Sequence, residues 1–268
     1  FDEAVLPTWA NVRHKLTASL GALHIRSQVF GLMHREDPAM QVRLALQTRK
    51  LGIQVSLEAG GALCGDGSGA SAAARLLRQL SGFIGAGGQL AFFALESVFS
   101  RTHLACPAQH LNQTADELGA YAGAIAASLP FAKLFLYDAL PHFSVGSEWP
   151  ANIAGFGLEL GATLHLLADA MAKRGAKLFG YWADCPYDYS SGTIDPLPGG
   201  LDGYQKLAAA VKLVKEMGLL VGKTFNAQAA GQTSDRAFHD DTLADFERTR
   251  ALVPGPSSGN FSLDYVMV

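Results

Sequence analysis

Short hydrophobic runs of strand-forming residues alternate along this chain with longer segments whose apolar residues recur at helical spacing. Thr114 and Glu117 match a capping box at the start of one helical segment, and Gly52 is the expected C-cap of another. Strands that alternate with helices at a period of about 42 residues predict a parallel sheet. The strand-like runs are HIRSQVF (24–30), IQVSLEA (53–59), LAFFALE (90–96), KLFLYDA (133–139), KLFGYWAD (177–184), LLVGKTFNA (219–227) and FSLDYVMV (261–268).

The number of repeats and the chain length favour a (β/α)₈ TIM barrel. The chain has 268 residues and no compositional break that would mark a linker, so we expect one barrel domain spanning 1–268. A doubly wound sheet is the alternative. The first strand-like run is not followed by a GxGxxG turn, and this absence weakens that alternative.

We expect the barrel's first strand to be incomplete in this sequence. A helical segment from Trp9 to Leu20 precedes HIRSQVF, and a barrel begins with a strand, so FDEAVLP (1–7) is expected to be what is left of strand one. LAFFALE is then the fourth strand, KLFLYDA the fifth, KLFGYWAD the sixth and GKTFNA the seventh. In the alternative count HIRSQVF is the first strand, every number falls by one and the last strand is missing.

Four strand-like runs have a carboxylate as their last or next-to-last residue. These residues are Glu58, Glu96, Asp138 and Asp184. Active sites of such barrels lie at the carboxyl ends of the strands, and crowded carboxylates push their pKa values apart, which creates an acid and a base from one residue type. We therefore expect these four side chains to be catalytic. In the alternative, each carboxylate only caps a loop or pairs with a lysine or arginine. Asn226 occupies the same register of GKTFN.

Aromatic residues beside the acids indicate the class of substrate. Sugar rings present apolar C–H faces that stack on aromatic rings, while their hydroxyls bond to carboxylates and amides. Alternation along the strand places Trp182 on the same side as Asp184. A carbohydrate is therefore the expected ligand, and the candidate substrate-binding residues are Tyr137, Trp182, Tyr181, His142 and Asn226.

The succession of ALES, a TADELGAYA helix, LFLYDALPHF and a C-terminal DYVMV resembles the glycoside-hydrolase-like (β/α)₈ proteins of bacteria. The resemblance implies hydrolysis of a poly- or oligosaccharide by paired carboxylates. In one large clan of these barrels the pair lies on strands four and seven, where this chain has Glu96 and Asn226, and an asparagine cannot be the nucleophile. A second clan pairs strands four and six, which implies Glu96 with Asp184.

Other activities fit part of the pattern. A divalent-metal-dependent sugar isomerase or epimerase would recruit Glu58, Glu96, Asp138 and His142 as ligands. A non-catalytic carbohydrate-binding barrel would keep the aromatic residues and tolerate loss of the acids. Lys223 inside a strand suggests a Schiff-base aldolase, although such a lysine is more often paired with a carboxylate, here Asp184. The glycosidase prediction requires neither a metal nor another cofactor.

Charge and composition restrict the partners. A net charge of −3 gives no reason to expect nucleic acid or an anionic membrane, and no run is long and apolar enough to span a bilayer. The three cysteines form no CxxC motif, and their odd number argues against a full disulfide framework. A leader could have been removed before FDEAVLP, and a secreted or periplasmic location is favoured over a cytoplasmic one. The oligomeric state is left open.

Overall fold

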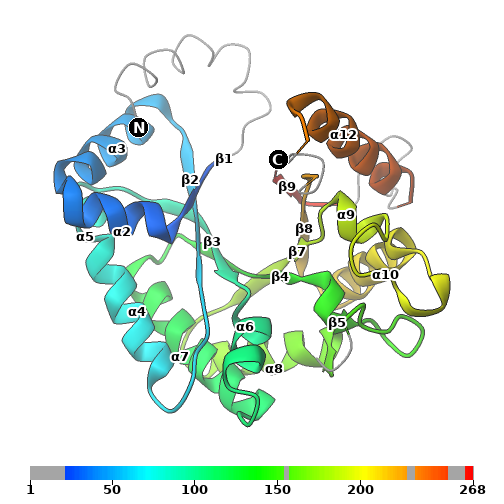
Figure 1. Ribbon diagram of the computed structural model, residues 1–268. Helices are drawn as coiled ribbons and strands as arrows, with labels where there is room; N and C mark the ends of the chain where they lie inside the picture. The colour runs from blue at the N-terminus through cyan, green and yellow to red at the C-terminus, as the bar shows by residue number, and fades with distance from the viewer. Residues whose placement is uncertain (1–21, 154–156, 228–232, 253–262, 268) are drawn as a thin grey trace.

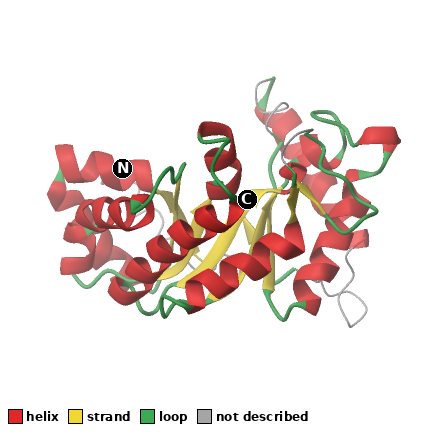
Figure 2. Ribbon diagram, turned by 90° about the horizontal axis from the view of Figure 1, so that it is seen from below, coloured by secondary structure: helices red, strands yellow, loops and turns green. Residues whose placement is uncertain are grey.

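Seven parallel strands form one curved sheet whose spatial order follows the chain (Figure 1 and Figure 2). The computed structural model describes residues 22–153, 157–227, 233–252 and 263–267. The strands are β1 (Ala22–Arg26), β2 (Gln54–Gly60), β3 (Leu90–Glu96), β4 (Lys133–Ala139), β7 (Leu178–Asp184), β8 (Leu220–Thr224) and β9 (Tyr265–Met267). Sequential parallel strands with a helix after nearly every one confirm the predicted (β/α)₈-barrel class.

Helices line the outer side of the arc that the strands form in Figure 1. Within the described residues, none of them is long and apolar enough to cross a membrane. A separate pair of two-residue strands, β5 (Phe143–Ser144) and β6 (Leu158–Glu159), lies between β4 and α8 in the chain. The helices are α2 (Ser27–Glu36), α3 (Pro38–Leu51), α4 (Ser68–Gln79), α5 (Ser81–Gly85), α6 (Val98–Ala105), α7 (Leu111–Ser128), α8 (Leu160–Ala172), α9 (Tyr187–Ser190), α10 (Gly203–Glu216) and α12 (Asp235–Leu252), with 3₁₀ turns η1 (Leu140–His142) and η2 (Pro198–Gly200).

Each strand places alternate side chains on opposite faces of the sheet. On β4, Leu134 and Leu136 belong to the large hydrophobic core shared with the helices. Phe135 and Tyr137 belong to a second, smaller cluster with Trp182. That cluster lies on the concave face, so the same alternation decides which strand-end acid faces the concave side.

The first described βα unit differs from its prediction. β1 ends at Arg26, and SQVF, predicted as strand, begins α2, because an apolar run of this length does not distinguish a strand from a buried helix. Asp37 and Pro38 divide the predicted helix 34–52 into α2 and α3, and Gly52 ends α3 in the left-handed region at φ 64°, as expected. FDEAVLP and the helix Trp9 to Leu20 lie outside the described residues, so the strand count of the barrel stays a prediction.

The capping box predicted for Thr114 and Glu117 is wrong. α7 begins earlier, at Leu111, and Thr114 donates back to the carbonyl of His110 inside the helix. Glu117 instead accepts from the backbone N–H groups of Gly67 at 2.8 Å and Gly69 at 2.7 Å, across 50 and 48 residues. Its carboxylate therefore caps the start of α4, a neighbouring helix, where the orphan N–H groups favour an anion.

A disulfide joins Cys64, in the loop after β2, to Cys106 at the end of α6. It fixes two connections at the carboxyl ends of neighbouring strands β2 and β3. Cys185 is a free cysteine and is buried. The pairing of two of the three cysteines agrees with the absence of a full disulfide framework.

A fully buried ion pair attaches α12 to the sheet. Lys223 of β8 donates to Asp245 of α12, both side chains have no exposed surface, and the ammonium lies 4.2 Å from the centre of the Phe225 ring. The predicted partner, Asp184, is wrong, because Lys223 faces the helices while Asp184 lies on the other face. A lysine enclosed in this way is not placed to form a Schiff base with a ligand on the concave side.

Replacing both Cys64 and Cys106 by serine is expected to lower the free energy of unfolding by about 2–4 kcal/mol, because the bond closes a 42-residue separation in the unfolded chain. Urea denaturation followed by circular dichroism measures the change. A thiol reductant should destabilise the wild-type protein to the same extent and leave the double variant unchanged. An equal effect of reductant on both proteins would contradict the pairing.

Asp245→Ala is expected to lower the free energy of unfolding by about 3–5 kcal/mol, because it leaves the Lys223 ammonium buried without its partner. Glu247→Ala on the same helix is the matched control. Its 4.0 Å pair with Arg250 is exposed, so a change within about 0.5 kcal/mol is expected. Similar losses for the two variants in urea denaturation would rule out a special role for the buried pair.

Candidate functional site

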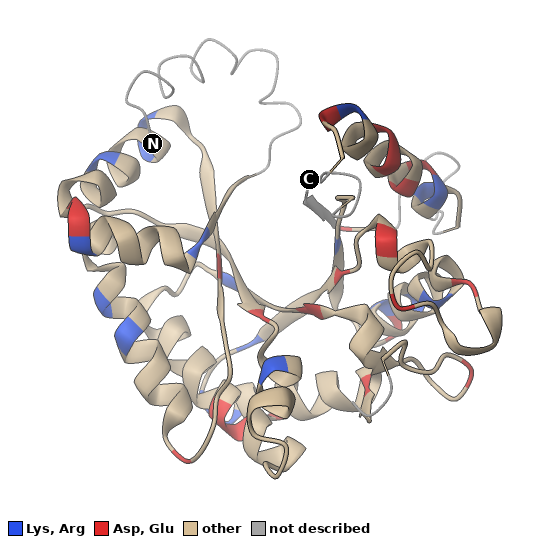
Figure 3. Cartoon of the chain, in the orientation of Figure 1, with Lys and Arg blue, Asp and Glu red and all other residues tan. Residues whose placement is uncertain are grey.

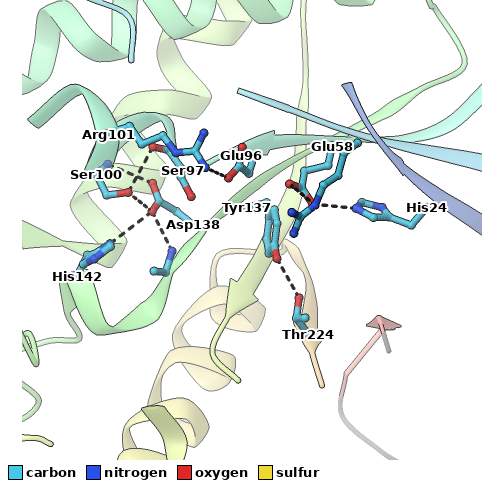
Figure 4. Close-up of polar contacts among 12 residues, drawn as sticks. His24, Glu58, Glu96, Ser97, Ser100, Arg101, Tyr137, Asp138, His142 and Thr224 are labelled. Atoms are coloured by element: carbon cyan, nitrogen blue, oxygen red, sulfur yellow. Dashed lines mark hydrogen bonds and ion pairs between the residues drawn. The ribbon is translucent and has the colours of Figure 1, made fainter. Parts of the chain in front are cut away.

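Three of the four strand-end carboxylates lie on the concave face, and the fourth does not. Glu96 and Asp184 share the alternation of Ala94 and Trp182, which form the concave cluster. Glu58 lies on the same face, because it bonds to His24, whose ring lies 6.3 Å from the ring of Trp182. Figure 3 shows the acidic residues at the ends of successive strands, and Figure 4 shows Asp138 turned away from Glu58 and Glu96.

Asp138 has a structural environment on the helix side of β4. Its carboxylate is fully buried and accepts from the Ser100 hydroxyl at 2.6 Å, from the Ser100 N–H at 3.4 Å and from the Ala139 N–H at 2.8 Å. It thus caps the first turn of α6. The expectation that all four acids share one site is therefore wrong for Asp138, because it follows Tyr137 by one residue and so points to the opposite face.

Glu58 is held between two basic side chains. His24 Nε2 lies 3.0 Å from one carboxylate oxygen, and Arg26 Nε lies 3.4 Å from the other. The second ring nitrogen of His24 bonds to Ser56 at 3.0 Å. Both oxygens of Glu58 are thus occupied, and its negative charge acts on neighbouring groups from a fixed position.

Glu96 ends β3 at a tightly built turn and forms an ion pair with Arg101 of α6. The next residue, Ser97, has a left-handed φ of 52° and donates its N–H to the Tyr137 carbonyl at 2.6 Å. A Cβ at Gly60 would overlap the Glu96 carbonyl, so only glycine fits there. Burial raises the pKa of Glu96, Arg101 opposes this rise, and the charges of Glu58 and Asp184 add to it.

Asp184 has the most perturbed carboxyl group on this face. Burial, followed by the charges of Asp138 and Glu58, raises its pKa to about 6, while a hydrogen bond from Tyr137 and the charge of His142 oppose the rise. Burial also raises the pKa of the Tyr137 phenol, which therefore stays protonated as a donor. Thr224 of β8 donates to that phenol oxygen at 3.4 Å. Asp184 therefore exchanges a proton near neutral pH.

Aromatic side chains form the floor of the concave side. Trp182 contacts Phe135 and Tyr137 edge to face at centroid distances of 6.0 and 6.4 Å. Trp182 and Tyr137 are only 5% and 6% exposed, so they leave a small area to a ligand. Tyr181 lies on the opposite face, where it packs on Phe143 and donates to the Asp138 carbonyl at 2.9 Å. The structure therefore separates Tyr181 from the other candidate binding residues.

The remaining two candidates lie at neighbouring strand ends. Asn226 follows β8, and its side-chain oxygen is buried without a hydrogen-bond partner among the described residues. Its backbone carbonyl accepts from the Tyr187 N–H at 2.9 Å, which fixes the loop after β8. His142 follows β4, with Nδ1 3.8 Å from Asp138, and its charge also acts on Asp184.

Sequence reasoning missed the basic partners of the acids. Neither Arg101 nor Arg26 is among the residues predicted for the site. The spacing in ESVFSR offered a signal, because a basic residue in the first turn after a strand can reach back to that strand's end. His24 offered none, since its contact with Glu58 joins residues 34 positions apart.

The arrangement does not fit a divalent cation. Within the described ranges, no group of three or more His, Cys, Asp or Glu side chains is placed to hold a metal ion. Glu58 and Glu96 are already paired with cations, and Asp138 is enclosed against α6. The expectation of a site without a tightly held metal stays a prediction, tested below.

Comparison with known proteins gives fold-level likenesses only. No protein-family model matches the chain, and no curated protein matches its sequence. One similar solved structure is a D-psicose 3-epimerase crystallised in the presence of D-fructose, with 10% identity, a TM-score of 0.46 and coverage of 94% of this chain and 93% of that one. Another is a 3-keto-D-glucoside 4-epimerase from E. coli, with 14% identity, a TM-score of 0.46 and coverage of 100% and 88%.

These matches correct the prediction of a glycosidase. Both enzymes are epimerases, which rearrange a sugar and do not hydrolyse a glycosidic bond. The implied resemblance to glycoside hydrolases is retained only at the level of the barrel fold. Likeness at this level assigns no reaction to the chain, so its own side chains carry the proposal that follows.

Asp184→Asn is expected to remove a pH dependence of stability. An acid whose pKa is raised on folding binds more protons in the folded state, so wild-type stability falls as the pH rises from about 4 to 6, by about 3 kcal/mol. The asparagine variant should lack that fall and be the more stable protein at pH 8. Asp169→Asn, on the exposed face of α8, is the matched control and should keep the wild-type profile. Parallel profiles for all three proteins in urea denaturation would contradict the raised pKa.

Proposed function

We propose that the chain is a sugar isomerase or epimerase that moves a proton on a carbonyl-bearing sugar by general acid–base catalysis. The observation that carries the proposal is the pairing of Asp184, with a pKa of about 6, and Glu96, with a raised pKa, on one face above an aromatic floor. A group whose pKa lies near the operating pH can both accept and return a proton.

In this proposal Asp184 is the principal base. It would remove a proton from a carbon next to the sugar carbonyl, and the electron pair would move to the carbonyl oxygen to give an enediolate. Return of a proton to that carbon from the other side, or to its neighbour, completes epimerisation or isomerisation. No oxidant or reductant is consumed, because the reaction only relocates a hydrogen.

The basic side chains support this chemistry by charge. Arg101, 47% exposed beside Glu96, is placed to donate to a developing oxyanion as well as to Glu96. Glu58, fixed by His24 and Arg26, contributes a negative charge that raises the pKa of both Glu96 and Asp184. His24 and Arg26 are therefore positioning residues in this scheme, because they act through Glu58.

The concave face suits a small neutral polyol. Trp182 and Tyr137 offer apolar edges, and the unpartnered oxygen of Asn226 can accept from a sugar hydroxyl. A disulfide between Cys64 and Cys106 is typical of oxidising compartments and supports the secreted or periplasmic location favoured from the sequence.

A panel of ketoses and keto-sugars in D₂O tests the proposal. Proton NMR should show loss of one C–H signal and appearance of an isomer or epimer. Asp184→Asn should reduce the rate by about 10²–10⁴-fold, since it removes the proton acceptor and keeps the shape. Asp169→Asn should retain activity, and exhaustive chelation should not change it. Exchange that persists in Asp184→Asn, or that requires a divalent cation, would contradict this mechanism.

A non-catalytic carbohydrate-binding barrel is the second candidate. The observation that favours it is the pairing of Glu58 and Glu96 with cations, which turns both acids into fixed hydrogen-bonding groups. Calorimetry with the same panel distinguishes the two. Sugar binding without proton exchange, unchanged in Asp184→Asn, would favour the binding protein.

A further inference from the structure

A cavity of about 430 Å³ lies away from the concave site, on the helix side of β2. It lies between α2 and α4 and is partly open to solvent, with contributions from the end of β2, from Val98 of α6 and from Tyr121 of α7. A volume of this size lies in the range of small-molecule sites. None of the roles described above uses it.

The polar lining of this cavity includes two arginines and two glutamines, of which Arg35, Arg75 and Gln28 are solvent-exposed. Arg35 and Arg75 both line it, and no Asp or Glu does. Among the described residues, neither arginine has an ion pair, and the side chains of Gln28 and Gln79 have no hydrogen bond. Two guanidinium groups with no carboxylate leave an excess of positive charge at this position.

The donors converge from two helices. A Cβ built on Gly31 of α2 would lie 3.7 Å from the Arg35 guanidinium and 3.4 Å from the Gln79 amide nitrogen of α4. Gly31 thus leaves open the space next to both groups. Arg75 lies close enough to Tyr121 for its charge to oppose the burial that raises the pKa of that phenol. Arginine is suited to a carboxylate or phosphate group because its planar donors match two oxygens.

Apart from Ser27 and the Tyr121 side chain, the rest of the lining is apolar. Leu32, Leu63 and Leu76 provide hydrocarbon surface, and Leu32 is 47% exposed although its side chain borders the cavity. An inorganic ion alone would leave this surface uncovered. A ligand that matches both the basic and the apolar portions of the lining has an anionic head and a short apolar body.

We propose that this cavity binds a small organic anion, whose carboxylate or phosphate group contacts Arg35 and Arg75 and whose apolar body covers Leu32 and Leu76. The site goes beyond the proposed catalytic function and does not depend on it. Gly60 lines the cavity and also abuts the backbone of Glu96, so the two sites share one wall.

A matched series of ligands tests this site by binding alone. Hexanoate, hexyl phosphate and 1-hexanol share a body and differ in the head group, and isothermal titration calorimetry with the full chain measures each. Both anions should bind, and hexanol should bind at least tenfold more weakly. The better of the two anions then distinguishes a carboxylate from a phosphate ligand.

Variants assign the binding to the two arginines. Arg35→Ala and Arg75→Ala should each weaken the binding of both anions about tenfold. The double variant should bind the anions no more tightly than it binds hexanol. Arg78→Ala removes an exposed arginine of α4 that does not line the cavity, and it should bind as the wild type does. Equal binding of hexanol and the anions, equal binding by the double variant, or no binding at millimolar concentration would overturn the proposal. Proton exchange on sugars is a separate readout, so failure here leaves the catalytic proposal standing.

Discussion

Alternation of side chains along seven parallel strands is the constraint on which the rest of this structure depends. A parallel sheet covered by helices buries its outer face completely, and its inner face is left for side chains that meet at the carboxyl ends of the strands. The side chains of Leu134 and Leu136 pack on the outer face, and those of Phe135 and Tyr137 pack on the inner face. A residue cannot change face without moving its whole strand by one position.

The concave face concentrates charges of both signs. Glu58 and Glu96 are each bound to a basic side chain, whereas among the described residues Asp184 forms no ion pair and receives a hydrogen bond from the Tyr137 phenol. The least compensated carboxyl group is therefore the one whose pKa approaches neutrality. Burial raises this pKa most, and the charges of Asp138 on the neighbouring strand β4 and of Glu58 on β2 raise it further.

Long-range polar contacts hold the loops around this face. Glu117 caps α4, Asp138 caps α6, and the bond between Cys64 and Cys106 joins the connections after β2 and β3. The bond from Ser100 to Asp138 holds the first turn of α6, which directly follows Glu96 and Ser97. The cavity behind β2 is bordered by α4 and by Val98 of α6, so both capped helices contribute to its wall.

The sequence by itself determined the parallel order of strands, most strand bounds and the position of the acids at strand ends. These features follow from local periodicity, and LAFFALE and KLFLYDA form strands over the predicted residues. Tertiary structure alone decided that Asp138 and Tyr181 face the helices, that Lys223 pairs with Asp245, and that His24 holds Glu58. The reason is physical: a run of buried residues shows that a strand is covered on both faces without showing which face each side chain occupies, and contacts across 22 to 43 residues leave no periodic trace in the chain.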